Sequence, residues 1–293
     1  MPPLLELHEA TVRFGGHVAV DQVNLAVDQG TVTGLIGPNG AGKTTMFNVI
    51  TGLQATTSGR VRFDGADITG RRAHRRSQLG IARTFQRLEV FGSLTARENI
   101  LVAAELRRRW GRRQPPTAGA TALLALTGLV EPSAAAAAVG DITPDAEAEA
   151  LVEFVGLGAV ADVRADELPT GQARLVELGR ALAIRPRLLL LDEPASGQDE
   201  TETESFARLL TQLAAAGMAI LLVEHDVPLV MRLCSIVHVL DFGSVLAVGT
   251  PAEIQADRAV LDAYLGSEPV VHEQPAPAPA PRSTGEPTTQ VAT

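Results

Sequence analysis

The sequence contains a single cysteine, Cys234, among 293 residues, so the chain cannot form an internal disulfide. Cys234 lies in a mostly apolar stretch, and we expect a small core side chain rather than a reactive thiol. Long apolar runs are also absent. The longest one, Ala214–Val223, is about half of the roughly 20 residues that span a bilayer. No basic-plus-apolar signal precedes the first apolar segment, so we expect the chain in the cytoplasm.

Basic residues are fewer than acidic ones, and 25 Lys and Arg against 34 Asp and Glu give a formal charge of −9. That balance argues against a general nucleic-acid binder, and no nucleic-acid partner is expected. Apolar residues make up 45% of the chain. The chain is therefore long and apolar enough for one large or two modest domains.

A glycine-rich loop stands between an apolar run at 32–36 and a helical pattern at 44–53. The loop fits the phosphate-binding pattern GxxxxGK[ST] with Gly37, Pro38, Asn39, Gly40, Ala41, Gly42, Lys43 and Thr44, and we add Thr45 to the nucleotide-binding residues. Glycines permit positive φ, so successive N–H groups can converge on an anion. Lys43 supplies a positive charge to the terminal phosphates, and Thr44 offers a hydroxyl to Mg²⁺. Because an incidental turn would not combine strand, loop and helix, the sequence predicts a nucleoside triphosphate site.

A second motif places two carboxylates after the apolar run Leu188–Leu191. Ligands of open α/β sheets bind at the carboxyl ends of the strands. We predict that Asp192 holds Mg²⁺ through water, and that Glu193 accepts a proton from the water that attacks the γ-phosphorus. The alternative is a pair of acids that opens the next helix, and the fully apolar strand before the pair disfavours it.

Periodicity predicts an α/β fold with a P-loop NTPase core, in which helices cover a parallel sheet. The alternation in Leu4–Val27 predicts two or three strands of an antiparallel β-subdomain. From about residue 88 to 163 the pattern becomes helical, which predicts an inserted α-helical subdomain. Apolar runs at 188–191 and 219–223 flank a helical stretch at 202–216, as a βαβ unit requires.

The predicted divisions of the chain follow from these patterns. Residues 1–87 form the first part of the ATP-binding core with the β-subdomain, and 88–165 form the inserted helical subdomain, with a low-complexity, loosely ordered segment at 114–145. Residues 166–250 complete the core, 251–266 form a C-terminal helix, and 267–293 form a disordered Pro/Ala-rich tail.

Further short motifs occur in a fixed order along the chain. They are Phe14 before two glycines, Gln86 in IARTFQ (81–86), LPTGQ (168–172), SGQD (196–199) and His225 in VEHD (223–226). Taken singly, such a histidine or phenylalanine is more often structural. In this order and approximate spacing they resemble the ATP-binding cassette (ABC) family, and the resemblance covers most of residues 4–265.

The resemblance implies a role for each motif. Phe14 would stack on adenine, and Gln86 would touch Mg²⁺ and the attacking water. His225 would contact the γ-phosphate, while Gly171 and Gln172 would cap ATP that is bound by the opposite subunit. The catalytic residues would thus be Glu193, His225 and Gln86, and the metal contacts Thr44, Gln86 and Asp192.

The segment at 168–172 departs from the family signature LSGGQ. Pro169 replaces a serine that donates its hydroxyl to the γ-phosphate, and Thr170 replaces a glycine. Proline offers neither a hydroxyl nor an N–H, so we expect a weaker contact with the opposite nucleotide. Gly171 still supplies a backbone N–H, and the capping should survive.

Within the family, GIARTFQ (80–86), FGSLT (91–95) and Glu98-Asn99 most resemble cassettes of branched-chain amino acid importers. Residues 251–265 resemble the C-terminal extension of the same group. Cassettes for urea and short amides share much of this pattern, so urea or amide uptake is the alternative.

The resemblance implies an ATP-hydrolysing subunit that dimerises around two ATP molecules and couples Mg-ATP binding and hydrolysis to uptake through membrane permease subunits. The implied partners are the permeases, a second ABC ATPase subunit of the same or a related sequence, and indirectly a solute-binding protein. The implied location is cytoplasmic and peripheral, on the inner face of the plasma membrane.

Two competing interpretations differ in function. A non-transport cassette that serves as a nucleotide-gated binding protein would carry long heptads or two phosphate loops, and this sequence has neither. A degenerate cassette would bind ATP without hydrolysing it. The five intact residues of the site disfavour that interpretation, while Pro169 leaves room for it; they are Lys43, Gln86, Asp192, Glu193 and His225.

Overall fold

The computed structural model describes residues 2–110, 118–130 and 142–265, which form two β-sheets and a set of helices. The predicted disordered tail at 267–293 lies outside the described residues. So do 114–117 and 131–141 of the predicted low-complexity segment.

The N-terminal sheet is antiparallel, as predicted, and consists of β1 (Leu5–Phe14), β2 (His17–Val27), β4 (Ser58–Phe63) and β5 (Ala66–Asp67) in the order β2–β1–β4–β5. Its strands alternate buried and exposed side chains, as a sheet with one solvated face requires. On β4, for example, Val61 and Phe63 are buried while Arg60 and Arg62 are exposed.

The second sheet has six strands and is mostly parallel. Its strands are β3 (Val32–Ile36), β6 (Ile81–Arg83), β7 (Leu188–Asp192), β8 (Ala219–Val223), β9 (Ile236–Asp241) and β10 (Ser244–Gly249), in the order β10–β9–β3–β8–β7–β6. Only β10 runs antiparallel to its neighbour. β9 and β10 thus form a hairpin at the edge of the sheet. Because the other strands are parallel, β3, β6, β7 and β8 all end at the same edge of the sheet.

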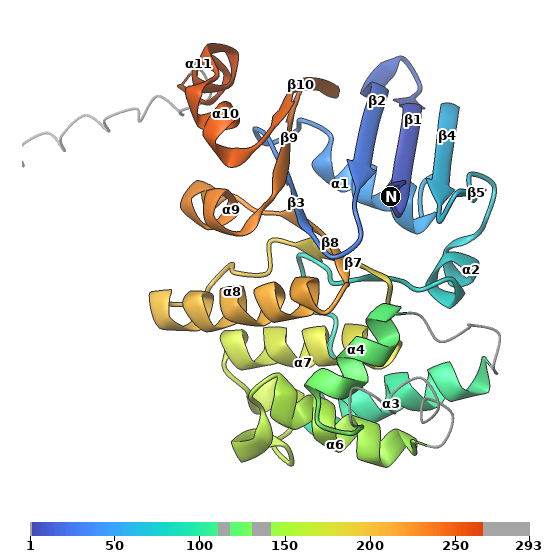
Figure 1. The fold of residues 1–293 in the computed structure, drawn as a ribbon, viewed down its shortest axis with the longest axis vertical. Coiled ribbons are helices and arrows are strands. Elements are labelled where there is room, and N and C mark those ends of the chain that lie inside the picture. The colour runs from blue at the N-terminus through green and yellow to red at the C-terminus, as the bar shows by residue number, and fades with distance from the viewer. Residues whose placement is uncertain (1, 111–117, 131–141, 266–293) are drawn as a thin grey trace, which may run out of the picture.

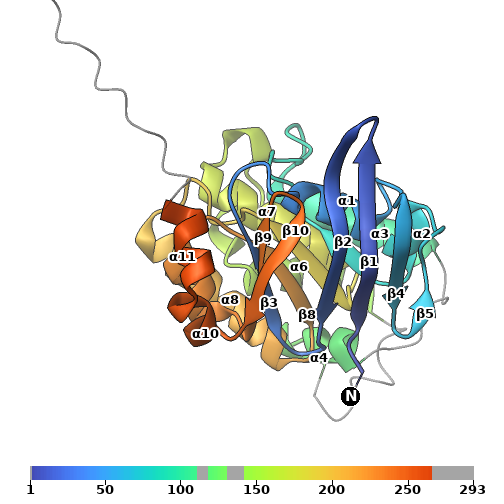
Figure 2. The ribbon, with the colours of Figure 1, turned by 90° about the horizontal axis from the view of Figure 1, so that it is seen from above.

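The described α-helices are α1 (Lys43–Thr51), α2 (Ala73–Gln78), α3 (Ala96–Arg109), α4 (Ala118–Leu126), α6 (Pro144–Phe154), α7 (Thr170–Ala183), α8 (Glu200–Ala215), α9 (Val227–Leu233), α10 (Pro251–Ala256) and α11 (Arg258–Leu265). Two short 3-10 helices, Gly158–Val160 and Ala165–Glu167, lie between α6 and α7. Figure 1 shows α3, α4, α6 and α7 grouped below α8 and the sheets. In Figure 2 the N-terminal sheet and the pair α10–α11 lie on opposite sides of β3 and β9.

Successive residues of the central strands enter two separate cores. Leu189 and Leu191 of β7 pack with buried side chains of α3, α6, α7 and α8. Leu188 and Leu190 pack with α1 and with the inner face of the N-terminal sheet. Both faces of the parallel sheet are thus covered, which explains the continuous apolar runs in the sequence.

Every described element between β6 and β7 is helical, in agreement with the predicted insertion. Gly179 of α7 lies so close to α3 that a Cβ there would be 2.5 Å from Cδ1 of Ile100. The buried Glu147 of α6 pairs with Arg185 at 2.6 Å and also with Arg107 of α3. α7 therefore packs against α3 and α6 of the helical group, and it also contacts β6.

Two segments differ from the expectation. Residues 118–126 of the low-complexity segment form the helix α4, and Leu123 and Leu124 are buried, since its apolar side chains reach the core. The predicted single C-terminal helix is divided into α10 and α11 at Asp257, which is extended and whose carboxylate accepts a hydrogen bond from the N–H of Ala259.

Within residues 2–110, 118–130 and 142–265, no helix is both long and apolar enough to cross a membrane.

Candidate functional site

The phosphate loop joins the end of β3 to α1, as the sequence predicts. Gly37 has a φ of 152°, and a Cβ at this position would lie 2.1 Å from the carbonyl oxygen of Leu240. Gly42, with a φ of 103°, also lies close to the backbone of β2, because a Cβ there would be 2.7 Å from the carbonyl oxygen of Ala19. Only glycine permits these two close approaches, which curve the loop into an anion-binding shape.

Lys43 folds back across this loop. Its Nζ donates hydrogen bonds to the carbonyl oxygens of Gly37, at 2.6 Å, and Pro38, at 3.0 Å. Burial lowers the pKa of Lys43, and the negative charges of Glu193 and Asp192 partly offset that shift. The contacts of Nζ with the loop carbonyls hold a positive charge at the loop, where it can pair with an anionic phosphate group.

The exposure of the remaining residues of the motif varies. Asn39, Gly40 and Thr44 are exposed, Pro38 and Thr45 are half-buried, and Ala41 is buried below them. Thr44 lies in the first turn of α1, where the helix N-terminus favours negative charge.

Three predicted catalytic residues meet at the same edge of the sheet. Glu193 follows β7, and its Oε2 accepts a hydrogen bond from Nε2 of Gln86 at 3.0 Å. Its Oε1 lies 2.8 Å from Nε2 of His225, which follows β8. Glu193 has a φ of 50°, a strained conformation for a residue with a side chain. The structure thus brings Gln86, Glu193 and His225 into one hydrogen-bonded group.

Asp192, the last residue of β7, lies next to this group and is buried. Its Oδ2 accepts a hydrogen bond from Nη2 of Arg83 at 2.7 Å. Nη1 of Arg83 donates to Oδ1 of Asn48 in α1 at 2.6 Å. The predicted metal carboxylate is therefore fixed to both β6 and α1.

The backbone around Gln86 is held by α7. Arg174 donates to the carbonyl oxygens of Phe85 and Gln86, at 2.7 and 2.6 Å, and Oε1 of Glu177 accepts the N–H of Phe85 at 3.0 Å. Arg174 and Glu177 also pair with each other at 3.3 Å. Burial raises the pKa of Glu177, and the N–H of Phe85 and the charge of Arg174 counter that shift.

Glu224, which follows β8, also holds backbone segments near the catalytic group. Its carboxylate accepts hydrogen bonds from the N–H groups of Ala195, at 2.8 Å, and His225, at 3.1 Å. Burial raises the pKa of Glu224, against the effect of these backbone N–H groups. Glu224 thereby connects the segment after Glu193 to the segment that carries His225.

The predicted signature residues and Phe14 lie apart from the hydrogen-bonded group around Glu193. Gly171 is in the first turn of α7, where a Cβ would be 2.6 Å from Oε1 of Glu202 in α8. Gln172 is half-buried beside it, and Pro169 is the N-cap of α7 without a side-chain hydrogen bond. Phe14 ends β1 and is half-exposed. Within one chain, these residues do not join the hydrogen-bonded group around Glu193.

Sequence reasoning missed four residues that position the site, namely Arg83, Arg174, Glu177 and Glu224. Arg83 and Glu224 stand within quoted motifs, and charged residues beside apolar strand ends were a usable signal. Arg174 and Glu177 lie on the buried face of a helix, where charge requires a partner. Their partner, the backbone of Phe85 and Gln86, is about 90 residues away in sequence and could not be inferred.

The donors at this edge suit Mg²⁺. Among the described residues, no three His, Cys, Asp or Glu side chains are grouped to hold a metal. The chain offers instead the hydroxyl of Thr44 and the carboxylate of Asp192, which are hard oxygen donors. Mg²⁺ typically takes one or two such groups and completes its shell with phosphate and water.

Known families match two parts of the sequence. The family described as "ABC transporter" matches residues 20–196, and the one described as "Branched-chain amino acid ATP-binding cassette transporter" matches residues 244–270.

Curated proteins match nearly the whole chain. The ATP-binding protein BraF of Pseudomonas aeruginosa, named for high-affinity branched-chain amino acid transport, is 39% identical over 90% of this chain and 98% of its own length. LivG of Escherichia coli, with the same described role, is 35% identical over the same shares. The lipopolysaccharide export ATP-binding protein LptB of Haemophilus influenzae is 31% identical over 85% of this chain and 91% of its own.

Solved structures agree with these sequence matches. The ADP conformation of MJ1267, an ATP-binding cassette of an ABC transporter, superimposes with a TM-score of 0.73 at 29% identity, over 91% of this chain and 100% of the other. A nucleotide-free cassette of an ABC transporter gives 0.72 at 28% identity, over 89% and 98%.

Proposed function

Because this chain belongs to the ABC transporter family, we propose that it is the ATP-hydrolysing subunit of a branched-chain amino acid importer. Cassettes of this family bind nucleotide and are ATPases that power transport. The observation that carries the proposal at the level of the site is the contact of Glu193 with both Gln86 and His225, beside Lys43 and Asp192.

In the proposed reaction, Lys43 and the backbone N–H groups of the phosphate loop hold the triphosphate. Glu193 accepts a proton from the attacking water as general base. Gln86 and His225 fix the orientation of its carboxylate, since each contacts one of its two oxygens. Thr44 and Asp192 would hold Mg²⁺, which would neutralise phosphate charge. Phe14 would stack on the adenine.

The site is proposed to be completed by a second subunit. Gly171, in the first turn of α7, lies against Glu202 of α8, whereas Lys43 folds across the phosphate loop. On this proposal, one chain presents the two halves of the site at different places. Two copies, or this chain and a related cassette, would place the start of one α7 over the nucleotide of the other.

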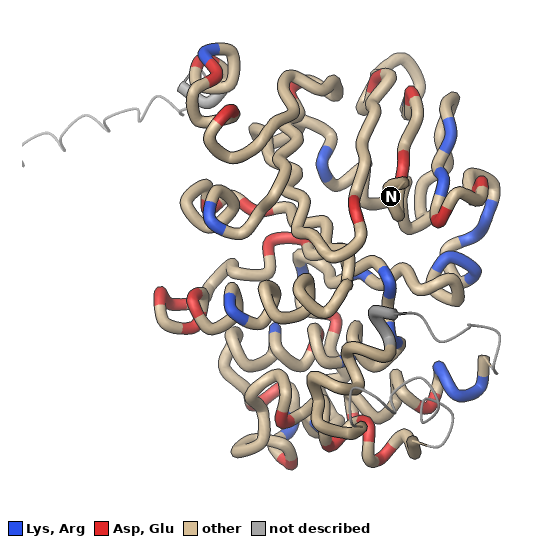
Figure 3. Tube along the Cα trace, in the orientation of Figure 1, with Lys and Arg blue, Asp and Glu red and all other residues tan. Residues whose placement is uncertain are grey.

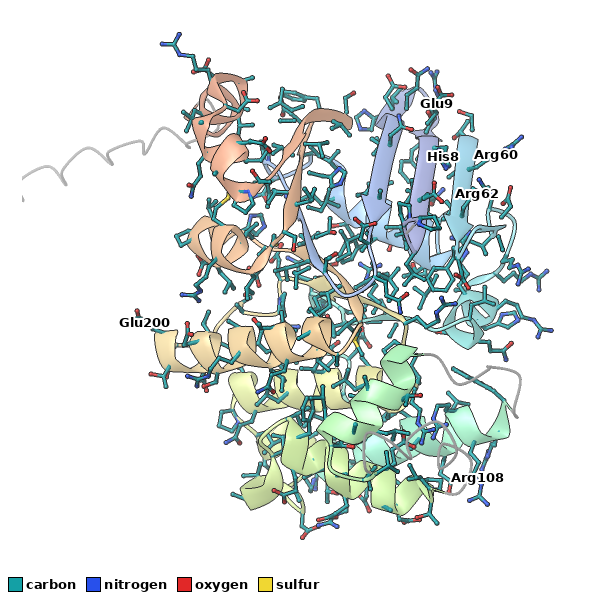
Figure 4. The ribbon with its side chains drawn as sticks, in the orientation of Figure 1. His8, Glu9, Arg60, Arg62, Arg108 and Glu200 are labelled. Carbon is teal, nitrogen blue, oxygen red and sulfur yellow. The ribbon has the colours of Figure 1, made fainter. Side chains whose placement is uncertain are left out.

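Exposed apolar side chains support a permease partner. Leu53 and Phe85 line a cavity together with His74 and Arg83. Leu88 and Phe91, which follow Phe85 in the sequence, are also exposed. Arginines accompany this region, since the basic residues of α2 and of the end of α3 lie on one side of the molecule in Figure 3. Figure 4 shows Arg108 on that side and Glu200 on the opposite one. An exposed apolar patch bordered by charge is typical of a protein interface.

The substrate class rests on the similarity to BraF and LivG and on the match of residues 244–270. Urea or a short amide is the alternative substrate class. A solute-binding protein would act on the permease rather than on this chain, and the proposed location is the inner face of the plasma membrane.

The proposal is tested by phosphate release from the purified chain. We expect release that requires both ATP and Mg²⁺ and that falls by at least about 100-fold in Glu193→Gln, the range for loss of a general base. Glu200→Gln is the matched control, because Glu200 is exposed at the start of α8. A wild-type chain that binds ATP without releasing phosphate would instead be a degenerate cassette.

A further inference from the structure

Arg83 is at the centre of three elements that carry the predicted metal contacts. Its guanidinium bonds Asp192, which ends β7, and Asn48, which lies in α1 four residues after Thr44. The guanidinium carbon lies 5.0 Å from the ring centroid of Phe85, the residue before Gln86. One side chain thus connects the elements that present Asp192, Thr44 and Gln86.

The guanidinium of Arg83 is itself packed against aromatic side chains. Its guanidinium carbon also lies 5.3 Å from the ring centroid of Phe47, so it packs between two aromatic rings. The side chains of Arg83 and Asp192 are only 6% and 4% exposed. Each of the two terminal nitrogens has a separate acceptor, a geometry that the planar fork of arginine permits and a lysine ammonium does not reproduce.

The pair leaves one oxygen of Asp192 available. Oδ2 accepts from Arg83, and no described residue donates a hydrogen bond to Oδ1. Because the Asp192 backbone N–H is 3.4 Å from Oγ1 of Thr84, the residue is fixed at its main chain as well. The arginine therefore sets the rotation of the carboxylate and with it the direction of Oδ1.

We propose that Arg83 is a positioning residue for the Mg²⁺ site. Arg83 aligns Asp192 with α1, so that the metal and the nucleotide bind cooperatively. This inference rests on the proposed Mg²⁺-dependent ATPase function. It assigns Arg83 no contact with nucleotide or metal, and it gives Asn48 a supporting role.

A purely electrostatic role predicts the opposite result. Arg83 adds a positive charge beside the metal site, so its removal would strengthen the attraction for a cation. A positioning role predicts that removal weakens cation binding despite the more negative site. Arg83→Lys keeps the charge and loses the fork, and so it separates the two roles.

The experiment is calorimetric titration of the full chain with the non-hydrolysable analogue AMP-PNP, in EDTA and in Mg²⁺. The dissociation constant in EDTA divided by the dissociation constant in Mg²⁺ is the ratio that measures the cooperativity between metal and nucleotide. We expect the ratio to fall at least fivefold in both Arg83→Lys and Arg83→Met, and by a smaller factor in Asn48→Ala. Unfolding temperatures without ligand, measured in parallel, report any structural loss separately.

Arg187 provides a matched control. It pairs with Asp64 at 2.7 Å and packs 5.4 Å from the ring centroid of Phe63, so it repeats the chemistry of Arg83 away from the nucleotide site. Arg187→Lys should leave the ratio unchanged.

A ratio within twofold of wild type in folded Arg83→Lys and Asn48→Ala would overturn the inference, and so would a higher ratio in Arg83→Met. If Arg83→Met does not fold, the other two variants still decide. A wild-type chain whose affinity for AMP-PNP does not depend on Mg²⁺ would contradict the proposed function itself.

Discussion

Glu193 and His225 lie 2.8 Å apart, from Oε1 to Nε2, at the ends of the neighbouring strands β7 and β8. The contact depends on the register of the sheet, because Asp192 of β7 is opposite Val223 of β8 and both strands then end at the same edge. The phosphate loop and the group around Glu193 thus follow four strand ends of one sheet, whereas Phe14 and the signature segment lie outside that edge.

Lys43 is the only lysine in the sequence, which makes it a specific chemical probe of the phosphate loop. We predict that ATP protects Lys43 from acetylation by an amine-reactive reagent at least tenfold, because bound phosphate would cover its Nζ. The N-terminal amine is an internal control and should react equally with and without ATP. Mass spectrometry quantifies both sites, and equal labelling of Lys43 in the two conditions would contradict phosphate binding by this loop.

Gly37 is predicted to tolerate no side chain. In Gly37→Ala the new Cβ would meet the carbonyl oxygen of Leu240, so we expect a loss of roughly 2 kcal/mol or more in the free energy of unfolding, with loss of ATP affinity. Gly16→Ala is the control, since nothing lies within 4 Å of a Cβ there. Chemical denaturation measures both variants. Equal stability of the two would show that the loop can move away from β9.

The fold and the centre of the site could be predicted because their signals are local. The run Leu188–Leu191 before Asp192 indicates a buried parallel strand. The glycines around Lys43 indicate a turn that follows a second buried strand. Since parallel strands end at one edge, the proximity of these motifs followed from the fold class.

The rest depended on contacts between distant segments. Neither the pairing of Arg83 with Asp192 nor the contact of Arg174 with the backbone of Gln86 has a sequence period that would reveal it. The division of the C-terminal helix was also missed, because an aspartate within a helical pattern does not reveal that its carboxylate accepts the N–H of Ala259. Tertiary packing decided these points rather than local propensity.

Stability should depend on the protonation of His238. Burial lowers the pKa of His238 to about 4, from an ordinary value of 6.5. The folded chain thus keeps this imidazole neutral while the unfolded chain protonates it, so its contribution is present above pH 6.5 and is lost as the pH falls towards 4. Between pH 7 and pH 5 we expect the wild type to lose about 2 kcal/mol more than His238→Leu.

The exposed His74 is the control for this prediction. His74→Gln should follow the wild-type dependence on pH in denaturant titrations. A His238→Leu chain that loses stability as steeply as the wild type would mean that other groups dominate the acid limb.

The proline at the start of α7 is predicted to weaken dimerisation. Pro169→Ser would restore a hydroxyl at the N-cap, where the resemblance places a donor to the γ-phosphate of the opposite site. In a Glu193→Gln background, which should trap ATP, we expect a several-fold tighter ATP-dependent dimer by analytical ultracentrifugation. The Thr170→Ser change in the same background, beside Pro169, serves as the control. An unchanged dimer constant in Pro169→Ser would show that the missing serine has no mechanistic weight.

The most direct test of the central claim is uptake of labelled leucine and labelled urea by source cells in which Glu193→Gln or the wild type is the only copy of this chain. We predict that Glu193→Gln abolishes leucine uptake and leaves urea uptake intact, with normal levels of the protein. Loss of urea uptake alone would contradict the branched-chain amino acid assignment and support urea or a short amide as the substrate class. Persistence of both uptakes, with phosphate release still abolished in the purified variant, would contradict the importer assignment and leave only the ATPase chemistry.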